Sequence, residues 1–270
     1  GLGGGDIASM ASVRIALPNT TSLGAALIIM ALALKAGLAP LNAWAAAAYG
    51  RAGGMGAVAL GGLGVAGAVL ALAHIAAAAS PSPAIGAGVG AALSALGMLS
   101  AAIGSVQAIG ATTIWRLGAY AVSAQAGCAL IGIGLGSTAG LEASVIQIVA
   151  LSASSVALFG ASVLGRADGA MASLDGLGRR APVSGAVMTV GALSLMGAPL
   201  TLSFLGRWRL IEAALGVGWW WAAGAVIAVS LAGSYYGGRI IERVYFRHAT
   251  QVQMPTNTDG AWRLALAPAI

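Results

Sequence analysis

Lys35 and Arg207 are the ionisable residues whose positions suggest chemistry. Lys35 lies near the middle of an apolar run, Leu23–Tyr49, that can cross a bilayer, because about 20 such residues span its hydrocarbon core. A lysine at that depth costs at least about 2.5–3.5 kcal/mol on insertion scales, and such residues mark ion or proton pathways. Arg207 lies in a second run, Val183–Leu215. A desolvated lysine can release its proton whereas arginine stays charged, so Lys35 is the candidate relay and Arg207 the candidate fixed charge.

Both runs contain helix-breaking residues close to the cation. Proline removes a backbone donor and clashes with the preceding turn, so we expect helix breaks at Gly37–Pro40 and at Gly197–Pro199. A broken helix beside a charge is a common way to build an ion site at mid-membrane. The alternative interpretation is that Lys35 extends to a membrane interface and that Pro40 only kinks the helix.

The remaining polar residues suggest neither catalysis nor metal binding. Arg209 and Glu212 are three residues apart on one helix face and are expected to form a structural charge pair. His74 closes an apolar run and is expected at the interface. Cys128 is the single cysteine, which excludes an intrachain disulfide and a cysteine-rich metal site. No Walker loop, no nucleophile elbow and no His–carboxylate metal spacing are present, so we predict no catalytic residue, no metal and no cofactor.

Composition places the chain in the membrane. Hydrophobic residues make up 59% of its 270 residues and charged residues only 7%, whereas a soluble domain carries about 25% charged residues. The 42 glycines suit helices that pack closely in lipid. The net charge of +6 does not indicate nucleic-acid binding, because the arginines fall in loops on one side. The expected partners are therefore the lipid bilayer and other membrane subunits.

Turn-forming residues divide the chain into about seven transmembrane helices, two of them broken. Most arginines follow the odd-numbered spans, and basic loops accumulate on the cytoplasmic side, so the C-terminal tail is expected on the cytoplasmic or matrix face. We expect an N-terminal loop (1–22), one transmembrane helical domain (23–247) and a C-terminal tail (248–270), which ends where a further apolar segment begins. The expected spans are Leu23–Tyr49, Met55–Ala78, Ala84–Ile109, Ile114–Leu135, Ala143–Leu164, Val183–Leu215 and Val217–Tyr236.

Four stretches together resemble the antiporter-like membrane subunits shared by respiratory complex I and the multisubunit cation/proton antiporters. They occur in the family's order and cover nearly the whole chain. Lys35–Trp44 (KAGLAPLNAW) resembles the motif K-x-x-x-x-P-x-x-x-W of the first broken helix, and Leu193–Trp208 (LSLMGAPLTLSFLGRW) resembles that of the second. The other two are Thr112–Gly127 (TTIWRLGAYAVSAQAG), at a helix entry, and Trp219–Phe246, which resembles the helix that follows the second broken one.

The resemblance implies a fold of two inverted five-helix repeats with a proton path of lysines and a glutamate at mid-membrane. This chain would correspond to its second half, with Lys35 at the first lysine position and Arg207 where the second broken helix usually has lysine or glutamate. The chain also departs from the pattern. The expected relay positions at Gly64–Val65 and Val149–Ser155 contain no ionisable residue.

Two functional hypotheses follow from the resemblance. The first is a subunit of a complex I-like or multisubunit antiporter-like assembly, ancestrally translocating protons or cations, in a bacterial cytoplasmic or mitochondrial inner membrane. It would have no active site of its own and could belong to a proton-translocating oxidoreductase of a respiratory chain. The alternative is a degenerate scaffold subunit of a respiratory or photosynthetic membrane complex that conducts nothing.

Overall fold

Every regular element is a helix in the part of the chain that the computed structural model describes, residues 18–79 and 83–248. This confirms the predicted all-α membrane fold. One isolated bridge pairs Thr113 with Ala170. The helices are α2 (Pro18–Lys35), α3 (Ala43–Val58), the π-helix η2 (Ala59–Gly64), α4 (Val65–Ala79), α5 (Pro83–Ile109), α6 (Ile114–Gly134), α7 (Thr138–Leu164), the 3-10 helix η3 (Met171–Leu174), α8 (Leu177–Arg180), α9 (Pro182–Met196), α10 (Leu202–Gly216), α11 (Trp220–Ile241) and the π-helix η4 (Glu242–Phe246).

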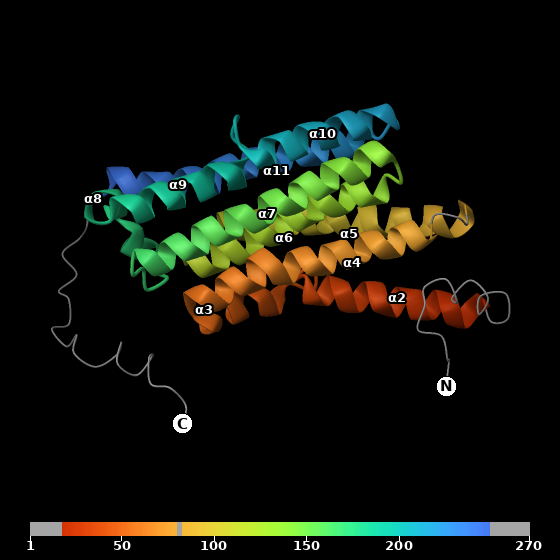
Figure 1. Ribbon diagram of the computed structural model, residues 1–270, viewed down its shortest axis with the longest axis horizontal. Coiled ribbons are helices and arrows are strands. Elements are labelled where there is room, and N and C mark those ends of the chain that lie inside the picture. The colour runs from red at the N-terminus through yellow and green to blue at the C-terminus, as the bar shows by residue number, and fades with distance from the viewer. Residues whose placement is uncertain (1–17, 80–82, 249–270) are drawn as a thin grey trace, which may run out of the picture.

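The helices run along one common direction (Figure 1). α2 and α3 follow each other along one edge of the bundle, and α9 and α10 follow each other along the opposite edge. Gly53, with φ +67° and ψ 179°, lies inside α3 and interrupts its helical geometry with a kink. Four stretches within the described residues are long and apolar enough to cross a membrane: Ala43–Ala79, Gly86–Ile109, Ile114–Gly134 and Thr138–Leu164. Two shorter apolar helices are Leu23–Lys35 and Pro182–Met196.

Helix starts follow the local sequence. Thr113, Ser137 and Thr201 precede α6, α7 and α10, and each side chain accepts a hydrogen bond from a backbone N–H of the first turn, which is the usual N-cap interaction. α2 begins at Pro18, five residues before the predicted span, because proline fits the first turn of a helix. Most of the expected terminal loop and tail lies outside the described residues.

α6 is the central helix and is almost completely buried. It packs against α5 through glycines, because a Cβ added to Gly97 would lie 2.6 Å from the carbonyl oxygen of Gly127. Gly90 approaches Gly134 in the same way, where the corresponding distance is 2.8 Å. These contacts leave no room for side chains, so the glycine content sets how closely the two backbones pack.

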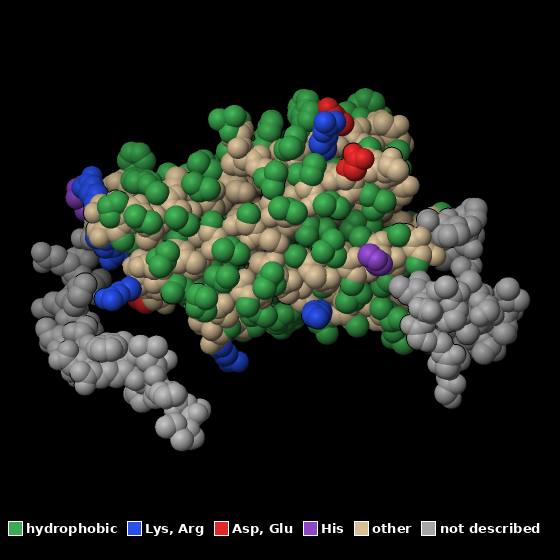
Figure 2. Space-filling model, in the orientation of Figure 1, with side chains coloured by type: hydrophobic (Ala, Val, Ile, Leu, Met, Phe, Trp, Pro, Cys, Tyr) green, Lys and Arg blue, Asp and Glu red, His purple; other side chains and the backbone are tan. Residues whose placement is uncertain are grey.

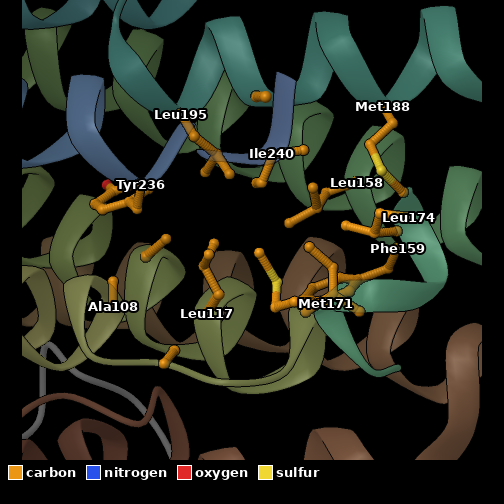
Figure 3. Close-up of a cluster of buried hydrophobic side chains, with 14 of the residues drawn as sticks. Ala108, Leu117, Leu158, Phe159, Met171, Leu174, Met188, Leu195, Tyr236 and Ile240 are labelled. Atoms are coloured by element: carbon orange, nitrogen blue, oxygen red, sulfur yellow. The ribbon is translucent and has the colours of Figure 1, made fainter. Parts of the chain in front are cut away.

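The largest cluster of buried apolar side chains joins α6, α7, α9 and α11. Leu117, Leu158, Leu195 and Ile240 are fully buried in it, and Figure 3 shows them pointing toward one another. Phe159 closes the cluster on the side of α3. Its ring centroid lies 5.4 Å from that of Tyr49 and 5.9 Å from that of Trp115, distances typical of attractive aromatic pairs.

Arginines tie the loops together at the end of the bundle near α8. Arg239 donates from Nη1 to the carbonyl of Ile109 at 2.6 Å and from Nη2 to that of Ala111 at 3.2 Å, which satisfies carbonyls at the end of α5. Arg243 forms a half-buried ion pair with Asp175 at 3.1 Å. Figure 2 shows Lys and Arg side chains gathered at this end, while uncharged side chains cover most of the visible face.

Candidate functional site

The connection between α2 and α3 closes the last turn of α2 at Gly37. Gly37 has φ +62°, and its N–H donates to the carbonyl of Leu34 at 3.0 Å. The N–H of Leu38 donates to the carbonyl of Ala33 at 3.0 Å. This is a Schellman turn, in which glycine adopts the left-handed conformation and helix-end carbonyls regain donors. Such donors matter at membrane depth, because lipid supplies none.

The same connection is hydrogen-bonded to α5. The Ala39 N–H donates to Ser100 Oγ at 3.2 Å, and Ser100 Oγ in turn donates to the carbonyl of Ser123 at 2.9 Å. The side-chain amide of Asn42 donates to Gln107 Oε1 at 2.5 Å. Polar groups of the bundle therefore hold this connection, and most of its residues are buried, although Pro40 is exposed.

Lys35 is the last residue of α2, and it is exposed. It has no hydrogen-bond or ion-pair partner in the described part of the chain. It borders a cavity of about 100 Å³ whose wall includes Trp44, Gly64 and Val65. The indole N–H of Trp44 donates to the carbonyl of Leu34 at 2.8 Å, so Trp44 adds a side-chain donor to the carbonyl that Gly37 already satisfies.

The connection between α9 and α10 repeats this geometry. Gly197 has φ +73°, and its N–H donates to the carbonyl of Ser194 at 3.1 Å. The N–H of Ala198 donates to the carbonyl of Leu193 at 3.0 Å. Both connections thus use a Schellman turn with the glycine at the same place in the pattern.

Arg207 closes the end of α9 from the neighbouring helix α10. It is only 3% exposed. Its Nη2 donates to the carbonyl of Leu195 at 2.7 Å, and its Nη1 donates to the carbonyl of Met196 at 2.6 Å and to Ser230 Oγ at 3.1 Å. A cation is favourable at a helix C-terminus, where the helix dipole is negative. The guanidinium therefore joins α9, α10 and α11 at one point.

The sequence of this helical bundle matches a known family over most of its length. Residues 6–232 match the model of the family described as NADH:quinone oxidoreductase/Mrp antiporter, TM. The chain belongs to this antiporter family. The predicted resemblance is confirmed, and the family places the chain among integral membrane proteins.

Solved structures of the antiporter family and its complexes share the fold. The chain superposes with a TM-score of 0.81 and 26% identity on a chain of the Mrp complex from Dietzia sp. DQ12-45-1b, covering 92% of this chain and 46% of that one. A chain of the archaeal membrane-bound sulfane sulfur reductase gives a TM-score of 0.75 and 25% identity, covering 90% of this chain and 52% of that one. A chain of respiratory complex I from Thermus thermophilus gives a TM-score of 0.72 and 24% identity, covering 85% of this chain and 51% of that one. The chain spans about half the length of these proteins.

The two stretches where the resemblance led us to expect relay residues contain small or uncharged side chains. Gly64 and Val65 line the cavity beside Lys35. Gly64 ends the π-helix η2, an irregularity often found at functional sites. In the stretch 149–155 the buried hydroxyls of Ser154 and Ser155 donate back to carbonyls of their own helix, and neither hydroxyl is an ionisable group.

Sequence reasoning missed the buried glutamines. Gln125 on α6 and Gln147 on α7 are fully buried, and none of their side-chain polar atoms has a partner in the described part of the chain. Ser203 Oγ and Arg207 Nε are unpaired in the same sense. Gln147 lies beside α10, because a Cβ added to Gly206 would be 2.8 Å from Gln147 Oε1. A glutamine in a helix of small residues was the available signal, because buried polar groups need partners.

The predicted charge pair lies on the surface, apart from Arg207. Arg209 Nη1 is 3.4 Å from Glu212 Oε2, with the two side chains 62% and 47% exposed, so the pair contributes little to stability. Glu212 also accepts a hydrogen bond from the Trp208 indole at 2.8 Å. His74 is exposed near the end of α4. No group of three potential metal ligands occurs among residues 18–79 and 83–248.

Proposed function

We propose that the chain is a membrane subunit of a multisubunit assembly that translocates protons or cations, and that Lys35 exchanges the proton. The observation that supports it most is the position of Lys35. It ends α2 beside a backbone turn, borders a cavity and has no partner among the described residues. Lysine is the basic side chain suited to a proton carrier in a membrane protein, a role that arginine cannot take.

We propose seven spans, in which α2 with α3 and α9 with α10 each form one span broken at Gly37–Pro40 and Gly197–Pro199. The helix bounds support this, since each pair runs in line along one edge of the bundle. The arginine-rich end near α8 would face the cytoplasm or the matrix. The membrane is a bacterial cytoplasmic or mitochondrial inner membrane, and the partners are other membrane subunits. Residues 1–22, 23–247 and 248–270 would form the loop, the transmembrane domain and the tail.

Arg207 has a different role in this proposal. Its two hydrogen bonds to the end of α9 and its bond to Ser230 hold a charge that does not titrate. It serves as a fixed positive charge of the second broken span, and Ser203 on the same helix and Gln147 beside Gly206 supply neutral polar groups nearby. The relay therefore depends on Lys35 more than on any other residue.

Proton uptake by the whole complex in proteoliposomes tests the proposal. Lys35→Met and Lys35→Arg should both reduce uptake by at least an order of magnitude, because neither side chain can release a proton at neutral pH. Arg51→Met is the matched control, since Arg51 is also an exposed cation but lies within α3, two residues before the kink at Gly53. It should leave uptake within about twofold of wild type.

Assembly must be measured beside transport, by the amount of complex extracted in mild detergent. Full uptake with Lys35→Met, at wild-type assembly, would end the relay proposal and favour the scaffold alternative. The family and the Lys35 site favour conduction over a non-conducting scaffold. The neutral residues Gly64 and Val65 are the feature that a scaffold explains better.

A further inference from the structure

An open groove runs along the outer face of α7. Its volume is about 650 Å³, and its wall includes Val149, Val156, Ala157 and Gly160 from α7 and Val187 from α9. Small side chains form its floor, and almost all of its lining is apolar. A channel of this shape on a membrane-exposed helix suits a flexible hydrocarbon chain.

Val187 of α9 is the groove's lining residue outside α7, and two elements, η2 and α9, pack against α7 beside it. The Ser152 hydroxyl donates to the carbonyl of Gly62 in η2 at 2.7 Å. On the other side, a Cβ added to Gly191 of α9 would lie 3.2 Å from the Cβ of Ala157. The groove extends along α7 from Val149 to Leu164, about 22 Å at 1.5 Å per residue. That length is about one and a half times the depth of one leaflet, which is half of the core of about 30 Å.

The groove ends where the arginine-rich loop begins. Ser184 Oγ at the start of α9 donates to the carbonyl of Ala161 on α7 at 2.5 Å, so both helices of the groove meet the loop together. Arg166 follows α7 by two residues and Arg179 precedes α9 by three; both are exposed and have no side-chain partner among the described residues. Asp168 is the exposed acid of this loop, so cations outnumber it.

We propose that this groove binds one phospholipid with an anionic headgroup. Its acyl chain lies along α7, and its phosphate lies at the loop, where Arg166 and Arg179 neutralise it. Charge complementarity selects the occupant: exposed arginines without partners at the end of a spanning helix attract anionic lipid by about 1 kcal/mol each. Two such arginines correspond to a preference of roughly 30-fold over a zwitterionic lipid. The inference does not depend on ion conduction.

Native mass spectrometry of the full chain, extracted in mild detergent, tests the proposal. The probes are phosphatidylglycerol and phosphatidylcholine of identical acyl chains. Wild type should retain one phosphatidylglycerol with roughly 30-fold preference. Arg166→Gln with Arg179→Gln should bring the preference below about threefold, whereas the corresponding double lysine variant should keep most of it, because it preserves the charge.

A variant that fills the groove tests binding of the acyl chain separately from binding of the headgroup. No atom lies within 4 Å of a Cβ added to Gly160, so Gly160→Leu projects into the groove without a clash and should abolish retention of the lipid. Gly224→Leu is the matched control, because a Cβ at Gly224 on α11 also meets nothing within 4 Å. Thermal unfolding verifies that both variants fold.

Three results would overturn the proposal. One is equal retention of the two lipids by wild type. Another is unchanged retention of phosphatidylglycerol by folded Gly160→Leu. The third is a cross-link from Ala153→Cys in the groove to a protein subunit instead of a lipid, which would show that a helix occupies the groove.

Discussion

Replacing Gly197 by alanine should destabilise the protein far more than its small size suggests. Alanine at φ +73° costs about 1–2 kcal/mol for the left-handed conformation. The new Cβ would also lie 2.7 Å from Arg207 Nη1 and 3.1 Å from Arg207 Cδ, so the guanidinium must move away from the end of α9. Each hydrogen bond to a charged group contributes about 1.5–3 kcal/mol. If one of the two bonds to the end of α9 is lost, the expected total is about 2.5–5 kcal/mol.

Two comparison variants isolate the arginine. Gly218→Ala has the same backbone problem, at φ +77°, but its Cβ meets nothing within 4 Å, so it should cost only about 1–2 kcal/mol. In an Arg207→Met background the cost of Gly197→Ala should fall to that same level, because no guanidinium remains to be displaced.

The free energy of unfolding can be measured by titrating SDS into mixed micelles and following the far-UV circular dichroism. If Gly197→Ala and Gly218→Ala differ by less than about 0.5 kcal/mol, within the error of additivity, the proposed coupling between the glycine turn and Arg207 is wrong. A large cost that persists in the Arg207→Met background would refute it equally.

Two further predictions concern the first connection and the topology. Trp44→Phe removes the indole donor to the Leu34 carbonyl and should lower the free energy of unfolding by about 1 kcal/mol in the same assay. Trp220→Phe is the control, because this tryptophan is 72% exposed and its replacement should change little. Equal costs would contradict the role of the indole. Asp168→Cys and Glu142→Cys should react with an impermeant maleimide from opposite sides of the membrane, without background because the native cysteine is buried; reaction from one side would refute the proposed topology.

The fold class and family could be predicted because they depend on composition and on local motifs. Few charges and many small residues indicate membrane helices whatever their partners. Gly37 and Gly197 stood out for a local reason too, since a left-handed helix end requires glycine within a few residues. Such features need no knowledge of the rest of the chain.

The partners of these turns could not be predicted, because they come from distant parts of the sequence. Ser100 meets Ala39 across 61 residues, and no local pattern links the two. The direction of Arg207 back onto α9 depends on how α10 packs. The exposure of Lys35 could not be predicted either. Its position in the middle of an apolar run does not show whether a neighbouring helix covers that face. The buried glutamines were passed over because they carry no charge.

Capping a membrane-embedded turn with an arginine makes that turn sensitive to voltage. Moving one elementary charge through the whole membrane potential changes the energy by about 2.3 kcal/mol per 100 mV, and partial movements scale with the fraction of the field crossed. Arg207 stays charged and is bonded to the end of α9, so any displacement of that turn along the membrane normal carries the charge with it. Trp44, the donor at the other turn, is neutral. An applied potential therefore acts on the charge that Arg207 holds at the second turn, whereas the indole that donates at the first turn carries none.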